Sequence, residues 1–520
     1  MLTHSSRRFQ YVHCELDCLA RCLPRHIQEA LNDLPDTLEG IYERTLRAIN
    51  NTHREAARRL LQCVTVASRP LRVEEVADLL AFDFQAKPIP KYRQDWRVKS
   101  SVKAVLSTCS TLISVVDIDN TQVVQLSHFS VREFLTSSHF AEKSDIISSR
   151  YHISMTPAHT VLAQACLSIL LHLDKDVTRD SLTKFPLTEY AAEHWFEHAR
   201  FEGVSRSADK GMKQLFDRRK HHLAIWLWIY DPTALPSDRD KSPRDVPSPA
   251  RGTPLHYAAF CGLRDVVEVL AIEHPRDVNS RRFKDESTPL HLALRKGHVE
   301  ASQFLIEHGA DAAAQDKGGW TPLHWASGEG HLELARLLLV EGGANAAAQD
   351  KGGWTPLHWA SGEGYLKLTR LLIEHGANAT APDKRGRTPL HWVSERGHVE
   401  LARLLLVEYG VDVAAQDKDG RTALHWVSEK GYIELARLLL VEHGADATAR
   451  DKGGRTPLHW ASEKGHVELS RLLLVEYGAD ASARAKDGRT PLHLASERNH
   501  VGLARLFAEH GADATAQVIP

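Results

Sequence analysis

The sequence predicts a mainly α-helical protein in which a mixed N-terminal region precedes a solenoid of about eight stacked repeats. A short core, Thr-[Pro/Ala]-Leu-His, recurs at spacings of 35, 33, 34, 33, 34, 34 and 34 residues. A composition of 42% hydrophobic and 25% charged residues is that of an ordinary globular chain. Because one such unit cannot bury its own apolar face, neighbouring units must stack. The core begins at Thr253, Thr288, Thr321, Thr355, Thr388, Thr422, Thr456 and Thr490.

The repeat that begins at Thr321 shows what each part of the unit does. Thr321 can cap a helix by accepting a hydrogen bond from a free backbone N–H, and Pro322 suits the first helical position. Gly330 lets the chain leave that short helix, and a second amphipathic helix begins at Leu332. A projecting Asp-Lys-Gly-Gly turn at 350–353 then leads to the next repeat. A Thr-Pro-Leu-His core at a period of about 33 residues is typical of ankyrin repeats.

Four of the seven spacings are one residue longer than the shortest. The segment 438–446, Leu-Leu-Leu-Val-Glu-His-Gly-Ala-Asp, holds one more residue before its glycine than Phe-Leu-Ile-Glu-His-Gly-Ala-Asp at 304–311. We therefore expect a one-residue extension in the second helix of the longer repeats, or at its end.

Length and charge place further limits on function. At 520 residues the chain is long enough for two or more domains, and seven cysteines do not describe a disulfide scaffold. A net charge of −2 and a pI of about 7.0 give no reason to expect nucleic acid, an anionic membrane or an acidic ligand as partner. The first ten residues lack the apolar run of a signal peptide, and the apolar run 223–229 is too short to span a bilayer. We expect a cytoplasmic protein.

The N-terminal half divides by pattern into helical and mixed segments. A helix opening at Pro70, a second at 98–109, and β-branched runs at 111–116 and 122–126 predict a winged-helix region. The DNA-binding form of that fold needs a basic reading helix, but the candidate helix offers only Lys99 and Lys103. A role in packing or regulation is therefore favoured over DNA binding. The expected organisation is a helical segment at 1–68, a winged-helix-like domain at 69–140, a helical region at 141–230, a Pro-rich linker at 231–250 and repeats at 251–520.

Two groups of side chains have metal-ligand residue types. Cys14, Cys18 and Cys22 share one helical face, but thiols in a line do not converge on one tetrahedral ion. His194 and His198 are one helical turn apart, without the glutamate placement of the His-Glu-x-x-His zinc motif. Both groups are interpreted as packing positions, and no metal or cofactor site is predicted.

Several stretches carry a family resemblance: Leu34-Pro-Asp-Thr-Leu, Tyr42-Glu-Arg, Ala67-Ser-Arg-Pro-Leu-Arg-Val-Glu-Glu-Val-Ala, Leu126-Ser-His-Phe-Ser-Val-Arg-Glu-Phe-Leu, Tyr190-Ala-Ala-Glu-His-Trp and the repeats. Their order resembles the fungal NACHT–ankyrin proteins, a branch of the NLR-like STAND signalling ATPases. Residues 34–136 also resemble the winged-helix module named after GPI inositol-deacylase.

The resemblance implies that the repeats sense or bind a ligand and that a NACHT ATPase module controls oligomerisation. No Gly-x-x-x-x-Gly-Lys-[Ser/Thr] or Gly-x-Ser-x-Gly occurs in this sequence, so we expect no catalysis. The alternatives are a regulatory subunit acting in trans with a separate NACHT ATPase and a truncated, non-functional paralogue.

Binding is expected on the concave surface formed by the turns and the first helices, with a protein of unknown identity as partner. Two exposed tryptophans and a column of arginines precede the repeat threonines, and charged residues end the first helices. Trp and Arg are enriched in binding hot spots, while weak Arg–Glu pairing across a solvated face is the alternative. The predicted protein-binding residues are Trp320, Glu329, Trp354, Glu363, Arg387, Arg396, Arg421, Lys430, Arg455, Lys464, Arg489 and Arg498.

Two further columns are interpreted as structural. A tryptophan follows the histidine at five positions inside the first helix, where packing is favoured over ligand contact. Successive histidines would lie about 10 Å apart by helix packing, too far to share a metal ion. The resemblance implies that each histidine links its turn to the neighbouring repeat. These columns are Trp325, Trp359, Trp392, Trp426 and Trp460, and His324, His358, His391, His425, His459 and His493.

Overall fold

The computed structural model describes residues 37–87, 89–97, 109, 112–143, 145–234 and 250–510. The chain forms two compact units, Met1–Glu273 and His274–Pro520. The predicted cysteine helix, the basic positions Lys99 and Lys103 and most of the 231–250 linker lie outside the described residues.

A small antiparallel sheet lies in the first unit, and its strand order is β1-β5-β4. The strands β4 (Ile113–Ile118) and β5 (Thr121–Leu126) form the predicted hairpin, with Val115 opposite Val124. Asp119 and Asn120 both adopt positive φ, at 49° and 62°, as a tight two-residue hairpin turn requires. The short strand β1 (Leu71–Arg72) pairs with β5, which gives the helix–strand order of a winged helix.

The core of the first unit surrounds α10 (Met155–His172), which packs against α4 (Arg54–Val66), α12 (Leu187–Ala199) and α13 (Ser205–Leu215). The stretch Ile146–His172 is long and apolar enough to cross a membrane by length and composition alone, and 56% of its most apolar 18 residues is buried inside the protein. The other elements of this unit are α3 (Leu38–Ala48), η2 (Asn51–His53), α5 (Val73–Leu79), β2 (Phe82–Asp83), β3 (Lys91–Tyr92), η3 (Gln94–Trp96), α7 (Phe129–Thr136), α8 (Ser138–Glu142), α9 (Ile146–Tyr151), α11 (Arg179–Leu182), α14 (His222–Ile229), α16 (Pro254–Cys261) and α17 (Arg264–Glu273).

Two fully buried carboxylates hold α5 in the first unit. Glu75 accepts hydrogen bonds from Arg69 at 2.6 Å and from Arg72 at 3.0 Å. Asp78 accepts from Arg97 at 2.6 Å and from the Leu187 backbone N–H at 3.0 Å. A buried charge is tolerated only when it is paired and hydrogen-bonded, so these contacts are interpreted as structural.

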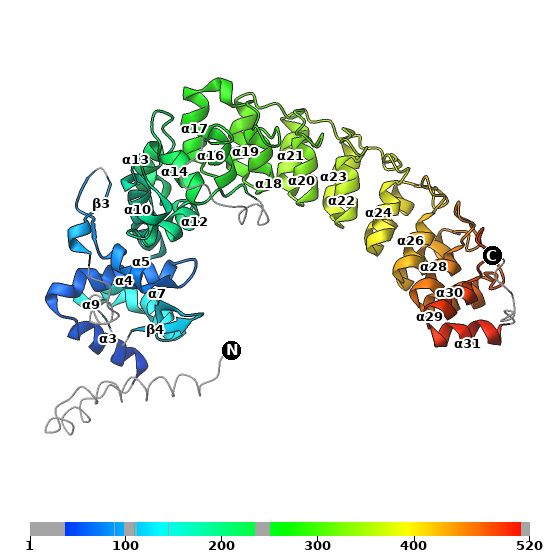
Figure 1. Cartoon of the computed structure of the whole chain (residues 1–520), viewed down its shortest axis with the longest axis horizontal. Helices are drawn as coiled ribbons and strands as arrows, with labels where there is room; N and C mark the ends of the chain where they lie inside the picture. Colours follow the sequence, from blue (N-terminus) through cyan, green and yellow to red (C-terminus); the bar gives the residue numbers. More distant parts are fainter. Residues whose placement is uncertain are drawn as a thin grey trace. The chain divides into compact units, whose positions relative to one another are not determined.

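The second unit is a ladder of helix pairs, confirming the predicted mainly α-helical repeat solenoid. Each first helix packs against the first helix of the next repeat, and Figure 1 shows the pairs following one another from α18 to α31. The elements are η4 (Pro275–Asp277), α18 (Pro289–Arg295), α19 (Val299–Glu307), α20 (Pro322–Gly328), α21 (Leu332–Val340), α22 (Pro356–Gly362), α23 (Leu366–Glu374), α24 (Pro389–Arg396), α25 (Val399–Arg403), α26 (Ala423–Lys430), α27 (Ile433–Arg437), α28 (Pro457–Lys464), α29 (Val467–Arg471), α30 (Pro491–Glu497) and α31 (Val501–Glu509).

The extra residue of the longer repeats is absorbed where the sequence predicted it. In three of them the second helix ends in a π-helical turn, η5 (Leu404–Glu408), η6 (Leu438–Glu442) and η7 (Leu472–Glu476). A π-helical turn accommodates one additional residue without breaking the helix. The fourth residue of η6, Val441, is 63% exposed, so the insertion is accommodated on the surface and the core keeps its register.

Candidate binding surface

The turns that precede the first helices are built in the same way in successive repeats. In one turn, Asp350 Oδ1 accepts hydrogen bonds from the backbone N–H groups of Gly352 at 2.7 Å and Trp354 at 2.9 Å. Gly353 adopts a φ of 79°, which the turn requires. The Lys384 N–H of the following turn donates to the Gly352 carbonyl at 3.0 Å. Neighbouring turns are therefore joined by backbone hydrogen bonds, as well as by the packing of their helices.

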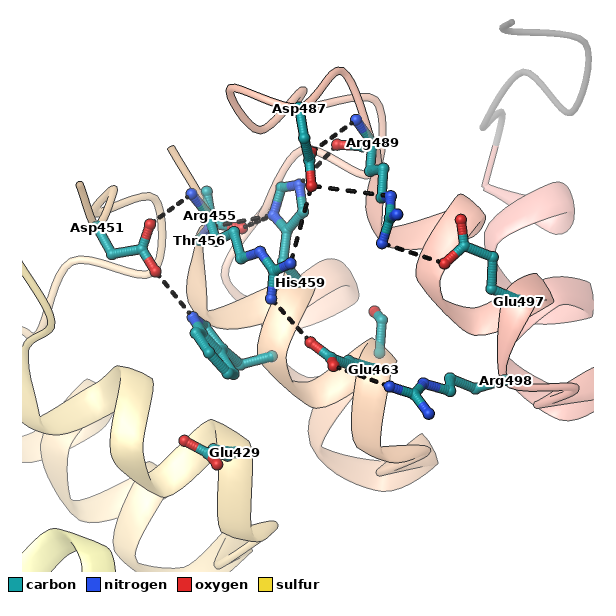
Figure 2. Close-up of polar contacts among 12 residues, drawn as sticks. Glu429, Asp451, Arg455, Thr456, His459, Glu463, Asp487, Arg489, Glu497 and Arg498 are labelled. Atoms are coloured by element: carbon teal, nitrogen blue, oxygen red, sulfur yellow. Dashed lines mark hydrogen bonds and ion pairs between the residues drawn. The ribbon is translucent and has the colours of Figure 1, made fainter. Parts of the chain in front are cut away.

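The column of histidines ties each turn to the next repeat, as expected. His459 Nδ1 accepts a hydrogen bond from the Thr456 backbone N–H at 3.0 Å, and its Nε2–H donates to the Arg489 carbonyl at 3.3 Å (Figure 2). This arrangement needs the neutral ring with its proton on Nε2. Burial is the main cause that lowers the pKa of His459 to about 4. The same inter-repeat bond is made, at 3.0 to 3.3 Å, by His291, His324, His358, His391, His425 and His459.

A second contact between repeats lies at the end of each first helix. Gly431 ends α26 with a φ of 81°, and a Cβ there would lie 2.4 Å from the ring of His466 in the next repeat. His466 Nε2–H donates to the Glu429 carbonyl at 3.1 Å. The glycine therefore serves both the left-handed backbone and the close approach of the next repeat's ring.

The two tryptophans predicted to be exposed are half-buried in an aromatic stack, so that expectation was wrong. The Trp320 ring centroid lies 4.7 Å from that of Trp325 and 4.3 Å from that of Trp359 in the next repeat. Trp354 is placed equivalently, 4.8 Å from Trp359 and 4.6 Å from Trp392. The turn tryptophan thus fills the space between two helix tryptophans, and the interpretation of the helix column as inter-repeat packing is confirmed.

The arginines of the column, predicted as protein-binding residues, make contacts within the array. Arg387 is only 8% exposed, donates to Asp383 at 3.1 Å and lies with its guanidinium 3.9 Å from the centre of the Trp392 ring. Each later arginine pairs with the glutamate eight residues on, and Figure 2 shows the last two of these pairs. The distances are 3.2 Å for Arg421–Glu429, 2.9 Å for Arg455–Glu463 and 3.3 Å for Arg489–Glu497.

The remaining predicted residues are exposed at the ends of the first helices. Arg396 pairs with Glu363 at 3.6 Å and Arg498 pairs with Glu463 at 3.4 Å, each across one repeat boundary. These exposed positions are accessible to a partner in the free chain. They are Glu329, Glu363, Arg396, Lys430, Lys464 and Arg498.

Sequence reasoning missed a second set of exposed cations, the lysines at the tips of the turns. The signal was present, because a lysine stands two residues before the turn glycine in six successive turns. These lysines are Lys317, Lys351, Lys384, Lys418, Lys452 and Lys486, and all six are exposed.

The histidine pair of the first unit is part of a buried hydrogen-bonded group. His198 Nδ1 lies 2.9 Å from His159 Nδ1, and its Nε2 lies 2.8 Å from the Tyr190 hydroxyl. Burial is the main cause that lowers the pKa of His198 to about 3. His194 contacts Glu197 at 3.0 Å instead. Within the described residues, no three His, Cys, Asp or Glu side chains gather closely enough to hold a metal ion.

Comparison with known families assigns both halves of the chain. Overlapping matches to the family model for ankyrin repeats cover residues 255–350, 290–383, 339–417, 378–451, 409–485 and 449–518. Residues 42–147 match the winged helix domain of GPI inositol-deacylase. The winged-helix expectation is therefore confirmed, and the ankyrin repeats indicate a binding module for protein partners.

Curated relatives match parts of the chain. Azaphilone pigments biosynthesis cluster protein L of Monascus ruber is 27% identical over 295 residues, which are 54% of this chain and 61% of that protein. Probable 26S proteasome regulatory subunit p28 of Saccharomyces cerevisiae is 39% identical over 95 residues, 18% of this chain and 41% of that protein. The chain thus spans less than two thirds of these relatives. Since the ankyrin-repeat matches together extend from residue 255 to residue 518, just over half of the chain, this protein belongs to the ankyrin-repeat family.

Proposed function

We propose that the repeat array binds a protein partner through its turns and first helices, and that the chain is the sensing part of an NLR-like signalling system in the cytoplasm. The partner surface supports this proposal most directly. The histidine bonds and the tryptophan packing between repeats do not use Lys430 and Lys464, which are exposed at the ends of the first helices. Because the repeat backbone is already ordered in the free chain, binding does not have to pay for ordering it.

The organisation of the chain supports the signalling part of the proposal. A winged-helix region at 42–147 stands before the repeats, the order found in the NACHT–ankyrin proteins that the sequence resembles. Action in trans with a separate NACHT ATPase is the second form of the same proposal, and a non-functional paralogue is its alternative. Purified chain should hydrolyse no ATP by itself, and measurable hydrolysis that copurifies with the chain would contradict a purely binding role.

Site-specific photocrosslinking tests which face the partner uses. A photoreactive amino acid is placed at Lys430 or Lys464, at the ends of first helices, and in matched variants at Val441 or Val475, on the second helices; all four positions are exposed. In extracts of the native host, the first pair should yield a discrete crosslinked protein and the second pair none. Crosslinks from the valine positions alone would place the partner on the opposite face and refute the proposal.

A further inference from the structure

One exposed lysine stands at the tip of each of six successive turns, from Lys317 to Lys486. Successive lysines are separated by 34, 33, 34, 34 and 34 residues, so each occupies the same place in its repeat. Among the described residues of the array, none of these six side chains has an ion-pair or hydrogen-bond partner. We refer to this set as the lysine row. It is the most regular group of free charges on the array.

Backbone hydrogen bonds hold the lysine row in register. The Lys418 N–H donates to the Arg385 carbonyl of the preceding turn at 2.7 Å, and the Lys452 N–H donates to the Asp419 carbonyl at 2.8 Å. The close approach is built into the turn, since a Cβ on Gly420 would lie 2.9 Å from the Lys452 nitrogen. The lysine backbones are therefore fixed one repeat apart, while the side chains extend into solvent.

Three of the turn carboxylates beside the lysine row are buried, whereas Asp419, next to Lys418, is exposed and adds one negative charge to that turn. Asp383, Asp417 and Asp451 are 5%, 7% and 8% exposed, because their oxygens accept hydrogen bonds from the backbone of their own turns. In the last turn an alanine, Ala485, stands in place of the aspartate. The exposed Asp487 lies 3.8 Å from both Arg455 and Arg489, so those arginines rather than the lysine offset it (Figure 2).

The second helices of the repeats that follow Lys384, Lys418 and Lys452 carry the opposite sign, whereas segment 366–379 contains two cations and one carboxylate. Segments 399–412, 433–446 and 467–480 each contain three carboxylates and one arginine. In the first two segments that arginine pairs with a glutamate of the next repeat, as in Arg437–Glu476 at 3.4 Å. A net chain charge of −2 therefore hides a separation of charge, with free cations on the turns and excess carboxylate on these second helices. Such a field steers an anionic partner toward the turns.

The geometry points to an acidic protein segment in the extended polyproline II conformation, lying along the lysine row with a carboxylate at about every third residue. Repeats stack about 10 Å apart by helix packing, and a polyproline II chain advances about 3.1 Å per residue with three residues per turn, so every third side chain lies on the same face about one repeat apart. The row of six lysines spans about 50 Å, which about 16 residues in this conformation cover. This inference rests on the proposed function, since it names the chemistry of the partner that binds the turn face.

Binding of defined peptides tests the spacing. Two fluorescent peptides of about 18 residues have the same composition, one with Glu at every third position and the other with all Glu clustered at one end. Fluorescence anisotropy with the full chain should show the periodic peptide binding at least about tenfold more tightly, and losing affinity as salt is added. Equal affinity for the two peptides would overturn the match between residue spacing and repeat spacing.

Charge-matched variants test the location. The triple variant K384E/K418E/K452E should lower the affinity for the periodic peptide at least about tenfold. The variant R336E/K367E/R471E makes the same change in charge on the second helices and should change that affinity less than about threefold. The three control residues are exposed, and circular dichroism should show both variants folded. Equal losses in the two variants would mean that net charge alone attracts the peptide, and would overturn the inference.

Two further outcomes also count against the inference. Tighter binding of a single-stranded 20-nucleotide DNA than of either peptide would assign the lysine row to nucleic acid. If neither peptide binds while crosslinking from Lys430 and Lys464 still captures a partner, the partner is not acidic, and the proposed function stands without this inference.

Discussion

Acid should destabilise the array much more steeply than its modest net charge implies, because six histidines must stay neutral in the folded chain. Each accepts a hydrogen bond from the threonine N–H on Nδ1, at 3.0 to 3.1 Å, and a proton on Nδ1 would break that bond. Burial, the largest cause, lowers the pKa of each below its ordinary value. The residues are His291, His324, His358, His391, His425 and His459.

The direction of the effect follows from proton uptake. Below the ordinary histidine pKa of 6.5, the unfolded chain binds protons that the folded chain does not, so the free energy of unfolding falls as pH falls. For His459, whose folded pKa is about 4, the loss reaches about 3 kcal/mol at pH 4. If all six histidines take up a proton on unfolding, the unfolding free energy changes with pH by at most about 8 kcal/mol per pH unit. At pH above 7 these histidines should contribute no pH dependence.

Urea unfolding followed by circular dichroism between pH 5 and 8 measures this slope. The variant H425Q keeps an acceptor within reach of the Thr422 N–H but cannot titrate. It should therefore make the pH dependence shallower, by at most one proton or about 1.4 kcal/mol per pH unit. An unfolding free energy that does not fall between pH 6 and pH 5, or an unchanged slope in H425Q, would refute the reasoning.

Three other predictions concern contacts between and within repeats. The double variant R421E/R455E should lower the unfolding free energy by about 2 kcal/mol. It places a carboxylate beside Glu429 and another beside Glu463, and it removes the cation 3.8 Å from the Trp460 ring. An unchanged urea midpoint would mean that these two arginines do not stabilise the array. Deleting Val441 should cost less than about 1 kcal/mol by chemical denaturation, since it removes a π-helical turn that the 33-residue repeats lack, and loss of the folded state would contradict this. G431A should cost about 2 kcal/mol more than G444A, because both glycines have positive φ but only the first has a ring within 4 Å; equal midpoints would exclude the clash.

The repeat period allowed much of the fold to be predicted. The threonine at the helix N-cap, the glycine exit, the projecting turn and the extra residue of the longer repeats all follow from local backbone rules and were found where expected. The cap bond differs from the prediction, because Thr321 makes no side-chain cap hydrogen bond and its N–H donates to His324 Nδ1 instead. The winged-helix hairpin was likewise predicted, because two β-branched runs joined by the turn-forming segment Asp-Ile-Asp-Asn are typical of a β-hairpin.

The candidate surface was predicted less well, because exposure depends on contacts between repeats that a single repeat does not reveal. Trp320 and Arg387 occupy equivalent turn positions and both look solvent-facing, yet each packs against an indole of a first helix. The lysines were overlooked since an Asp-Lys-Gly-Gly turn is explained by its Asp and Gly alone. The buried positions of Asp383, Asp417 and Asp451 show that these aspartates do not neutralise the lysines beside them.

Hydrogen–deuterium exchange of the full chain, with and without the periodic acidic peptide, tests the binding face most directly. We expect amide exchange to slow on peptide binding in the turns 417–421 and 451–455, where the Lys418 and Lys452 N–H groups bond to the preceding turns. Exchange in α27 (Ile433–Arg437) should not change. Protection confined to α27 and its neighbouring second helices, with the turns unchanged, would contradict this expectation.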